Sequence, residues 1–282
     1  SDKRLHSCRI IPERGSWIEV NVTKKDTLVV RIDQSGRFAA TTLLRAMAEE
    51  YGTDDEIIKL FYETADVKLS ASTALKRLKG QIAGHDINDP ETGEVLLATG
   101  EVITESFLKN LLKDRKPGDQ TVRVILEGQD GLVLNTLKED PARSHEEALI
   151  RIYQRLRPGN PPQLAKAKEL FYEKFYNPNK YRLGRVGRFR INRKFGQQVP
   201  ETEMTLNKED LINSIRYILD LRTSGKEALV DDIDHLGNRR VRTIEELAAE
   251  EFRKGFLKLK RTVQERMSLA ADKEKLTPRA II

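Results

Sequence analysis

The residues best suited to chemistry in this sequence lie between positions 230 and 242. The acidic and imidazole side chains of this segment are Asp231, Asp232, Asp234 and His235. Carboxylate oxygens and imidazole nitrogens are common ligands of divalent metal ions, so a metal-dependent phosphohydrolase is one hypothesis. No second cluster of histidine and carboxylates occurs elsewhere to complete a ligand shell. We therefore favour a turn at Gly237 and Asn238, with aspartate and arginine paired across it, and predict no metal ion.

A second unusual segment, residues 184–194, combines arginine, glycine and one aromatic residue. Its cations are Arg185, Arg188, Arg190, Arg193 and Lys194. The planar guanidinium fork donates two parallel hydrogen bonds to a phosphate, and glycine lets the backbone come close to a ligand. We predict strand or loop for residues 182–194. The pattern leaves two interpretations open, a phosphate-binding segment or a solvated basic strand.

Other kinds of catalytic site are excluded by the residues present. The sequence has no Walker or dinucleotide-binding glycine loop and no serine elbow. The only cysteine, Cys8, excludes an internal disulfide and a cysteine-based zinc site, and we predict that it is a small buried hydrophobic residue. The only tryptophan, Trp17, is predicted to anchor a hairpin in the core, whereas an exposed position would favour a stacking role.

The composition allows a folded protein with a charged surface. Of the 282 residues, 38% are hydrophobic and 33% are charged, and 50 Lys+Arg against 44 Asp+Glu give a net charge of +6. This modest excess favours contact with a polyanion, but it argues against a stand-alone nucleic-acid-binding regulator with high affinity of its own. No apolar run reaches the roughly 18 residues of a membrane span, and no signal peptide is apparent. The first residue is not methionine, and both ends suggest a piece of a longer protein.

Several elements must position these residues. Alternating apolar residues predict a hairpin from residues 16–22 and 27–32, and helices are expected at 41–50 and after Thr53, with Glu56 in its capping box. Short β-prone runs at 95–98 and 121–126, separated by glycine turns, predict an inserted β-rich module with one helix capped by Thr104.

The second half is predicted to be mainly helical. A capping box of Ser144 and Glu147 opens a helix that must end before Pro158, a further helix covers 162–175, and Asn207 caps the next. The last helix follows a capping box of Thr243 and Glu246 and has an apolar stripe, which we predict to be core, and a basic opposite side. The fold class is therefore α+β. We divide the chain into 1–65, an inserted module at 66–138, 139–230 and a helical segment at 231–282.

Six stretches of the sequence resemble one protein family. They are 9–17, 30–33, 43–46, 155–162, 181–188 and 230–242, the last reading Val-Asp-Asp-Ile-Asp-His-Leu-Gly-Asn-Arg-Arg-Val-Arg. They occur in the order found in the β subunit of bacterial DNA-directed RNA polymerase, so the chain resembles an internal portion of that subunit. Glu13 departs from the aromatic residue that the family has at this place.

The resemblance implies a place in the polymerase and a set of contacts. Residues 1–230 would form the lobe, one wall of the DNA cleft, and 231–282 the return into the protrusion and fork region. Positions matching Ile233, Asp234 and Arg239 belong in the family to a pocket that receives a base of the non-template strand. The positions expected to face promoter DNA are Arg157, Arg188, Arg242, Lys258 and Arg261.

The resemblance also implies partners and a division of labour. The nucleotidyl transfer would belong to the assembled enzyme, whose catalytic Mg2+ is held by the β′ subunit, so we expect no catalytic residue and no cofactor in this chain. The implied partners are the β′, α and ω subunits, the remainder of β, the sigma factor, and the template and non-template DNA strands. A cytoplasmic, nucleoid-associated location without membrane contact is implied as well. The apolar face of 231–282 would be exposed or shared in an oligomer if those partners were missing.

Overall fold

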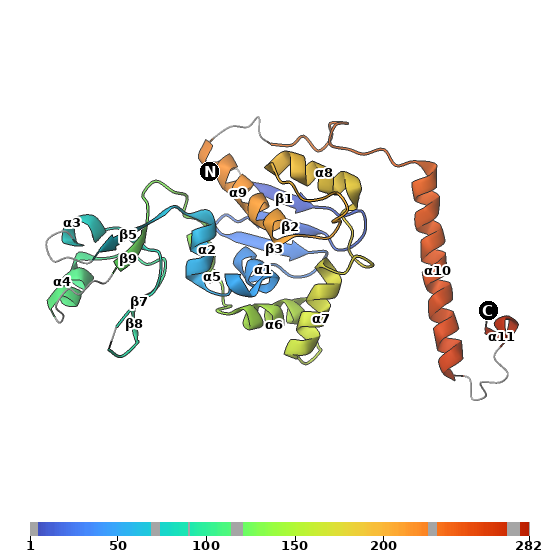
Figure 1. Ribbon diagram of the computed structural model, residues 1–282, viewed down its shortest axis with the longest axis horizontal. Coiled ribbons are helices and arrows are strands. Elements are labelled where there is room, and N and C mark those ends of the chain that lie inside the picture. Colours follow the sequence, from blue (N-terminus) through green and yellow to red (C-terminus); the bar gives the residue numbers. More distant parts are fainter. Residues whose placement is uncertain are drawn as a thin grey trace. The chain divides into compact units, whose positions relative to one another are not determined.

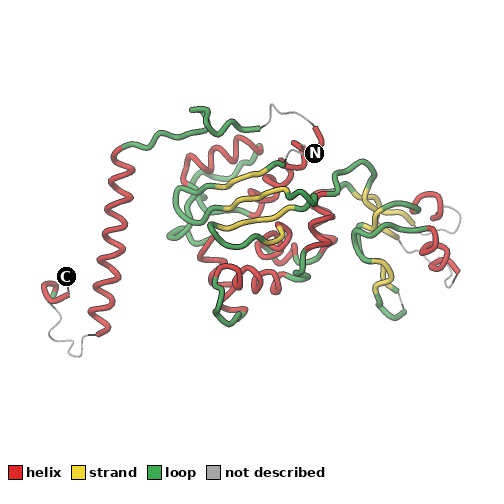
Figure 2. Tube along the Cα trace, turned by 180° about the vertical axis from the view of Figure 1, so that it is seen from behind, coloured by secondary structure: helices red, strands yellow, loops and turns green. Residues whose placement is uncertain are grey.

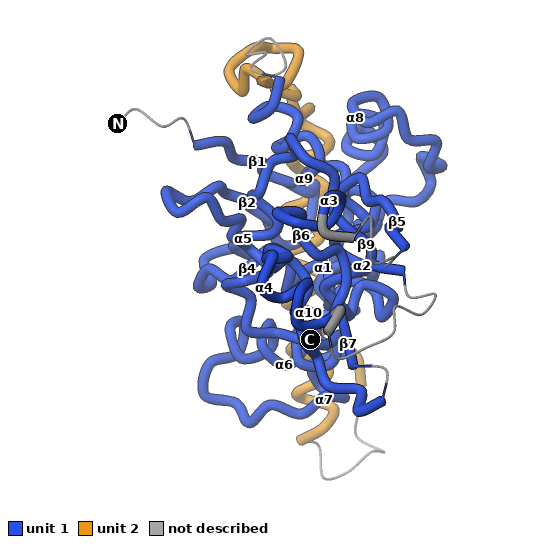
Figure 3. The backbone as a smooth tube through the Cα atoms, turned by 90° about the vertical axis from the view of Figure 1, so that its left-hand side faces the viewer, with its two compact units in different colours: residues 1–226 blue, residues 227–282 orange. Residues whose placement is uncertain are grey.

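Both helices and strands are present in the computed structural model, which describes residues 5–68, 74–89, 91–113, 121–224, 230–269 and 277–281. The chain forms two compact units, residues 1–226 and 227–282, coloured blue and orange in Figure 3. Helices alternate with small antiparallel sheets. The predicted α+β class is therefore confirmed.

The first unit is built on a four-stranded antiparallel sheet in the order β1-β2-β3-β4, whose strands lie side by side in Figure 2. The strands are β1 (Ser7–Ile10), β2 (Ile18–Val22), β3 (Leu28–Ile32) and β4 (Phe38–Ala39). Every second residue of β2 and β3 is buried, as the alternation of apolar and polar residues requires. Ile18 pairs with Ile32 and Val22 with Leu28, so the predicted hairpin is confirmed.

Helices complete the main core around this sheet (Figure 1). They are α1 (Ala40–Met47), the short 3-10 helix η1 (Glu49–Tyr51), α2 (Asp54–Phe61), α5 (Leu132–Glu139), α6 (His145–Leu156), α7 (Leu164–Phe175), α8 (Gly184–Phe195) and α9 (Lys208–Ser224). Helix α1 is central because it contacts β3, α5, α6 and α9. Its eight residues are all buried, which a helix surrounded by other elements requires.

A buried polar network joins α1 to the connection between α5 and α6. The Asp140 carboxylate accepts hydrogen bonds from the Thr41 and Thr42 hydroxyls at 2.5 and 2.7 Å and from the Ala142 N–H at 2.9 Å. The Arg45 Nε lies 3.4 Å from the same carboxylate, and its guanidinium also pairs with Asp54. A buried carboxylate needs such partners, because an unpaired charge in the interior is strongly destabilising.

A smaller group of elements between α2 and α5 has a hydrophobic core of its own. Its elements are β5 (Thr64–Lys68), α3 (Ala74–Leu78), β6 (Ile82–Ala83), β7 (Ile87–Asn88), β8 (Val95–Leu97), α4 (Glu105–Lys113) and β9 (Thr121–Ile125). The strands form a sheet in the order β5-β9-β6 and a separate β7-β8 pair. Leu78, Ile103 and Val122 belong to this second core. The domain limits at 66 and 138 stay a prediction.

In the first unit, three of the four predicted N-cap side chains accept a backbone N–H at the start of their helix, and one does not. The Ser144 hydroxyl accepts the Glu147 N–H at 3.2 Å, but the Glu147 carboxylate accepts from the Arg143 N–H instead of the Ser144 N–H. The Thr104 and Asn207 caps are confirmed by bonds from the Phe107 and Glu209 N–H groups. Thr53 makes no backbone cap, because its hydroxyl donates to the Asp55 carboxylate.

The strand or loop predicted for residues 182–194 was wrong, because residues 184–195 form helix α8. Gly184 and Arg188 are buried on one side of this helix, whereas Arg185 and Val186 are exposed. Gly196, with φ 65°, ends the helix in the left-handed conformation that glycine adopts at little cost. The local pattern did not predict a helix here because the helix depends on a long-range ion pair of Arg188, which is described below.

The second unit contains residues 230–243 without regular structure, then α10 (Ile244–Leu269) and α11 (Pro278–Ile281). The apolar stripe of α10 was predicted to be core, and within this unit it is not: Phe252 and Phe256 are 70% and 66% exposed. The stripe has helical periodicity, but periodicity does not supply a surface to cover it. Among the described helices, none has the length and apolar character needed to cross a membrane.

Candidate nucleic-acid interface

Residues 232–239 of the second unit form a turn held by its own hydrogen bonds. The Asp232 carboxylate accepts the Asp234 N–H at 3.0 Å, and the Asp232 carbonyl accepts the Asn238 side-chain amide at 2.7 Å. The His235 Nδ1 accepts the Gly237 N–H at 2.9 Å, and its carbonyl accepts the N–H groups of Asn238 and Arg239. The turn predicted at Gly237 and Asn238 is therefore present.

The side chains of three predicted site residues in this turn are exposed to solvent. Ile233 is 74% exposed, and Asp234 and Arg239 are exposed as well. Within the described part of the chain, the Asp234 carboxylate and the Arg239 guanidinium have no partner. A hydrogen-bond acceptor, a donor fork and an apolar side chain thus remain available within seven residues. Carboxylates accept from base amino groups, and arginine donates to base edges or phosphates.

The same bonds argue against the competing metal site. The Nδ1 of His235 is occupied as an acceptor, and one Asp232 oxygen is used within the turn. In the ranges that the structure describes, no group of three or more histidine, cysteine, aspartate or glutamate side chains could hold a metal ion.

The cations that follow the turn divide into paired and unpaired ones. Arg240 makes two bonds to the Glu246 carboxylate, at 2.6 and 2.8 Å, and Arg242 pairs with Glu250. Lys258 and Arg261 are exposed on α10, and among the described residues their charged groups have no partner. Arg242 would have to leave Glu250 to bind a phosphate, whereas Lys258 and Arg261 need no such exchange.

The two site residues predicted in the first unit have opposite environments. Arg157 is exposed at the carboxyl end of α6, where its N–H bonds to the Tyr153 carbonyl and its side chain is free within the described chain. Arg188 is completely buried and bonds to both oxygens of Asp210 at 2.8 and 3.0 Å. Its Nε and Nη2 also donate to the Glu203 and Thr205 carbonyls. In this structure Arg188 therefore cannot reach DNA, because folding has used its donors.

Trp17 corrects a second expectation, because it does not anchor the core. Its side chain is 54% exposed, although β2 begins at the next residue. The backbone N–H of Trp17 donates to the Asp33 carboxylate at 2.8 Å, and Lys174 Nζ donates to the same carboxylate at 3.1 Å. Burial raises the pKa of Asp33, but the bonds from Ser16, Trp17 and Lys174 outweigh it and lower that pKa. An ionised Asp33 thus fixes the backbone beneath an exposed indole, which favours the stacking role.

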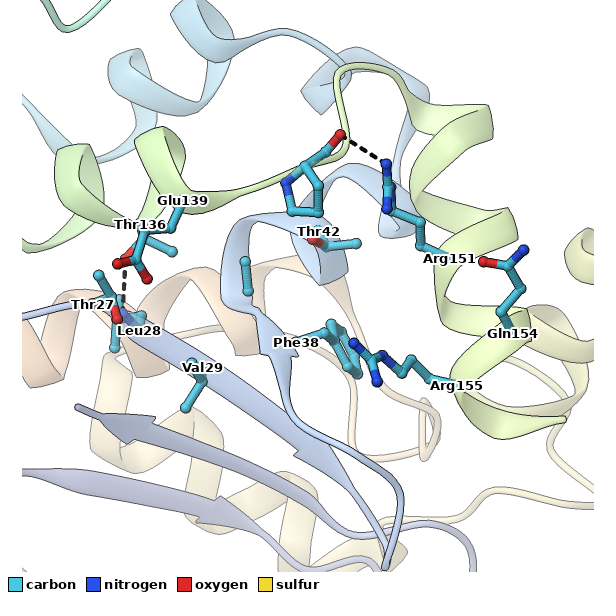
Figure 4. Close-up of a pocket in the computed structure, with 12 residues that line it drawn as sticks. Thr27, Leu28, Val29, Phe38, Thr42, Thr136, Glu139, Arg151, Gln154 and Arg155 are labelled. Carbon is cyan, nitrogen blue, oxygen red and sulfur yellow. Dashed lines mark hydrogen bonds between the residues drawn. The ribbon is translucent and has the colours of Figure 1, made fainter. Parts of the chain in front are cut away.

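A hollow of about 450 Å³ in the first unit lacks catalytic groups (Figure 4). Its floor comes from β3 and β4, and its walls include Thr136, Arg151 and Arg155. The Thr136 hydroxyl accepts the Leu28 N–H at 2.7 Å, and Arg151 bonds to Glu147 and the Pro141 carbonyl. These polar groups hold neighbouring elements together, and no nucleophile paired with a base lines the hollow.

Comparison with known proteins agrees with the pattern of the sequence. The family model described as RNA polymerase Rpb2, domain 2, matches residues 125–242. A DNA-directed RNA polymerase subunit beta of Rhodopirellula baltica is 54% identical over the whole chain, and that of Methylacidiphilum infernorum is 40% identical over 99% of it. The chain spans 23% and 22% of the lengths of these two relatives. On this similarity from end to end, the chain belongs to the family of bacterial DNA-directed RNA polymerase β subunits.

Proposed function

We propose that this chain contributes to one wall of the DNA cleft in a DNA-directed RNA polymerase. It contacts the downstream duplex and the unpaired non-template strand while DNA is transcribed into RNA. The nucleotidyl transfer belongs to the assembled enzyme, in which the remaining subunits, the sigma factor and DNA are its partners. The Mg2+ of that reaction is bound by the β′ subunit, so the chain alone does not catalyse.

The observation that carries this proposal is the division of roles within the turn of residues 232–239. Asp232, His235 and Asn238 hold the backbone, and Ile233, Asp234 and Arg239 are left outward without partners in the described structure. A preformed turn reduces the entropy lost on binding, because its backbone is ordered beforehand. An unpaired base could receive hydrogen bonds from Arg239, donate to Asp234 and contact the apolar Ile233.

The exposed cations would supply affinity that does not depend on sequence. Arg157, Lys258 and Arg261 are available for phosphates, and each neutralised phosphate of a single strand adds about 0.7 to the slope of log affinity against log salt. Trp17 adds an exposed aromatic face on which a base can stack. Arg188 is left out of this proposal because its charge is already neutralised by Asp210.

The test is binding of labelled forked DNA, with its unpaired base varied, to the 282-residue chain at low and moderate salt. We expect weak, salt-sensitive binding whose base preference is lost in Asp234→Ala/Arg239→Ala. The loss should amount to about 1 to 3 kcal/mol, the discrimination of one good base contact. Arg240→Ala/Glu246→Ala is the matched control, because it also removes one cation and one anion, here a pair bound to each other.

A second arm places the same substitutions in the full-length β subunit of an assembled polymerase and measures the lifetime of its promoter complex. A shorter lifetime for Asp234→Ala/Arg239→Ala than for the control would support the proposal. Equal base preference and equal lifetimes for the two variants would refute it.

A further inference from the structure

Helix α8 separates its basic residues into an inner and an outer side. Arg188 points inward and is completely buried. Arg185, Phe189 and Arg193 follow one another at intervals of four residues, which places them on one side of a helix. Both arginines are exposed, and Phe189 is 49% exposed. We call these three residues the outer face of α8.

The charges of this outer face are not neutralised by the fold. Helix α8 contains no aspartate or glutamate. In the part of the chain that the structure describes, the guanidinium groups of Arg185 and Arg193 have no ion-pair or hydrogen-bond partner. By contrast, Arg188 is paired with Asp210, and the Lys194 ammonium lies 4.1 Å from the centre of the Tyr217 ring. The fold therefore neutralises the buried Arg188 with Asp210 and leaves Arg185 and Arg193 available to a polyanion.

The exposed phenylalanine narrows the choice of polyanion. An acidic peptide would use the arginines but has no general need for a half-exposed aromatic ring between them. An unpaired nucleic-acid strand offers phosphates and flat bases together, and aromatic side chains among cations are the usual means of binding such strands. Arg185 and Arg193 are separated by eight residues, about 12 Å along the helix axis, so they can contact different phosphates on either side of a base stacked on Phe189.

We propose that the outer face of α8 binds an unpaired DNA strand, with Arg185 and Arg193 on phosphates and Phe189 against a base. This inference rests on the proposed role at the wall of a DNA cleft and adds a contact surface separate from the turn of residues 232–239. Of the two interpretations that the sequence left open for residues 184–194, a phosphate-binding segment or a solvated basic strand, the inference favours the first for the exposed side of the helix. One of its arginines is structural, and two of the others bind phosphate.

The experiment measures binding of single-stranded DNA to the 282-residue chain as a function of salt. Arg185→Gln/Arg193→Gln should lower the slope of log affinity against log salt by about 1.4, twice the value for one phosphate of a single strand. Phe189→Ala should weaken binding about fivefold, the lower end of the range for stacking, and leave the slope unchanged. Lys166→Gln/Lys168→Gln on α7 is the charge-matched control, since both lysines are exposed.

The outcomes separate this inference from the proposed function. Binding that is equal in the α8 variants and in the α7 control would overturn the inference and leave the turn untouched. An effect of the arginine pair without any effect of Phe189→Ala would overturn the stacking of a base on Phe189. Weakened binding in the α8 variants, with normal base preference in Asp234→Ala/Arg239→Ala, would support the inference and refute the base contact at the turn. A parent chain that binds no DNA at any salt would overturn the inference.

Discussion

Replacing Arg188 by methionine should destabilise the first unit without acting on DNA directly. The guanidinium makes four hydrogen bonds, two to the Asp210 carboxylate and one each to the Glu203 and Thr205 carbonyls. Both side chains are buried, Arg188 being 0% exposed and Asp210 1%. Without Arg188, the Asp210 carboxylate keeps the Asn207 N–H at 2.8 Å but has no counter-charge in the interior.

The expected loss is about 3 to 5 kcal/mol in the free energy of unfolding, because removing one partner leaves an uncompensated buried charge. Unfolding by urea, followed by far-UV circular dichroism, measures it. Arg185→Gln on the exposed side of the same helix should change the stability by less than about 0.5 kcal/mol. Asp210→Asn retains an oxygen for the Asn207 N–H, so Arg188→Met/Asp210→Asn should be more stable than Arg188→Met alone.

The reasoning would be refuted by an Arg188→Met variant that unfolds within about 1 kcal/mol of the parent and binds DNA more weakly. That result would return Arg188 to the list of DNA contacts. An Arg188→Met variant that loses about 3 to 5 kcal/mol of unfolding free energy, and whose DNA affinity per folded molecule is unchanged, would establish that Arg188 has a structural role.

Two further predictions concern a glycine and an exposed carboxylate. Gly15→Ala should cost roughly 3 kcal/mol of unfolding free energy and Gly196→Ala about 1 kcal/mol. A Cβ at Gly15 (φ +122°) would lie 2.7 Å from the Tyr181 side chain, whereas a Cβ at Gly196 (φ +65°) would have no atom within 4 Å. Equal urea midpoints for the two variants would contradict this prediction. Hydrogen bonds from Lys109 and then Lys79 lower the pKa of Glu105 to about 2. Since the folded pKa lies below the unfolded value, the stabilisation is present above about pH 4.5 and is lost as the pH falls towards 2. A carboxyl titration by NMR should show this shift reduced by high salt and by Lys109→Gln, and an ordinary pKa in the parent would disprove the pairing.

Local patterns were sufficient for much of the fold. The hairpin of β2 and β3 was predicted from alternating residues because one face of each strand packs on the core. The start of α6 was predicted from Ser144 and Glu147, and Pro158 explains why this helix ends at Leu156. These features depend on residues that are close together in the chain, so they could be predicted from the sequence alone.

Helix α8 and the exposure of Trp17 could not be predicted in this way, and for α8 the reason is a distant contact. The segment that forms α8 has glycines and β-branched residues, which weaken helix propensity, and the pairing of Arg188 with Asp210 spans 22 residues. Trp17 has the size and apolar character of a core residue, yet it is 54% exposed, and its backbone N–H bonds to the Asp33 carboxylate. In α8 a polar partner distant in sequence overrides the local preference, and no local pattern indicates the exposure of Trp17.

The candidate site required both kinds of information, since net charge alone does not identify a DNA contact. The excess of cations is only +6, yet Arg188, Arg240 and Arg242 are each paired with a carboxylate and contribute little free charge. The cations available to a phosphate are those that the fold leaves exposed and unpaired in its described part, and they include Arg157, Arg185, Arg193, Arg239, Lys258 and Arg261. Binding a phosphate with one of these breaks no existing ion pair, whereas Arg242 must first release Glu250. The unpaired set should therefore dominate the dependence of DNA binding on salt, because each of its members can displace a condensed counterion without losing a partner in the protein.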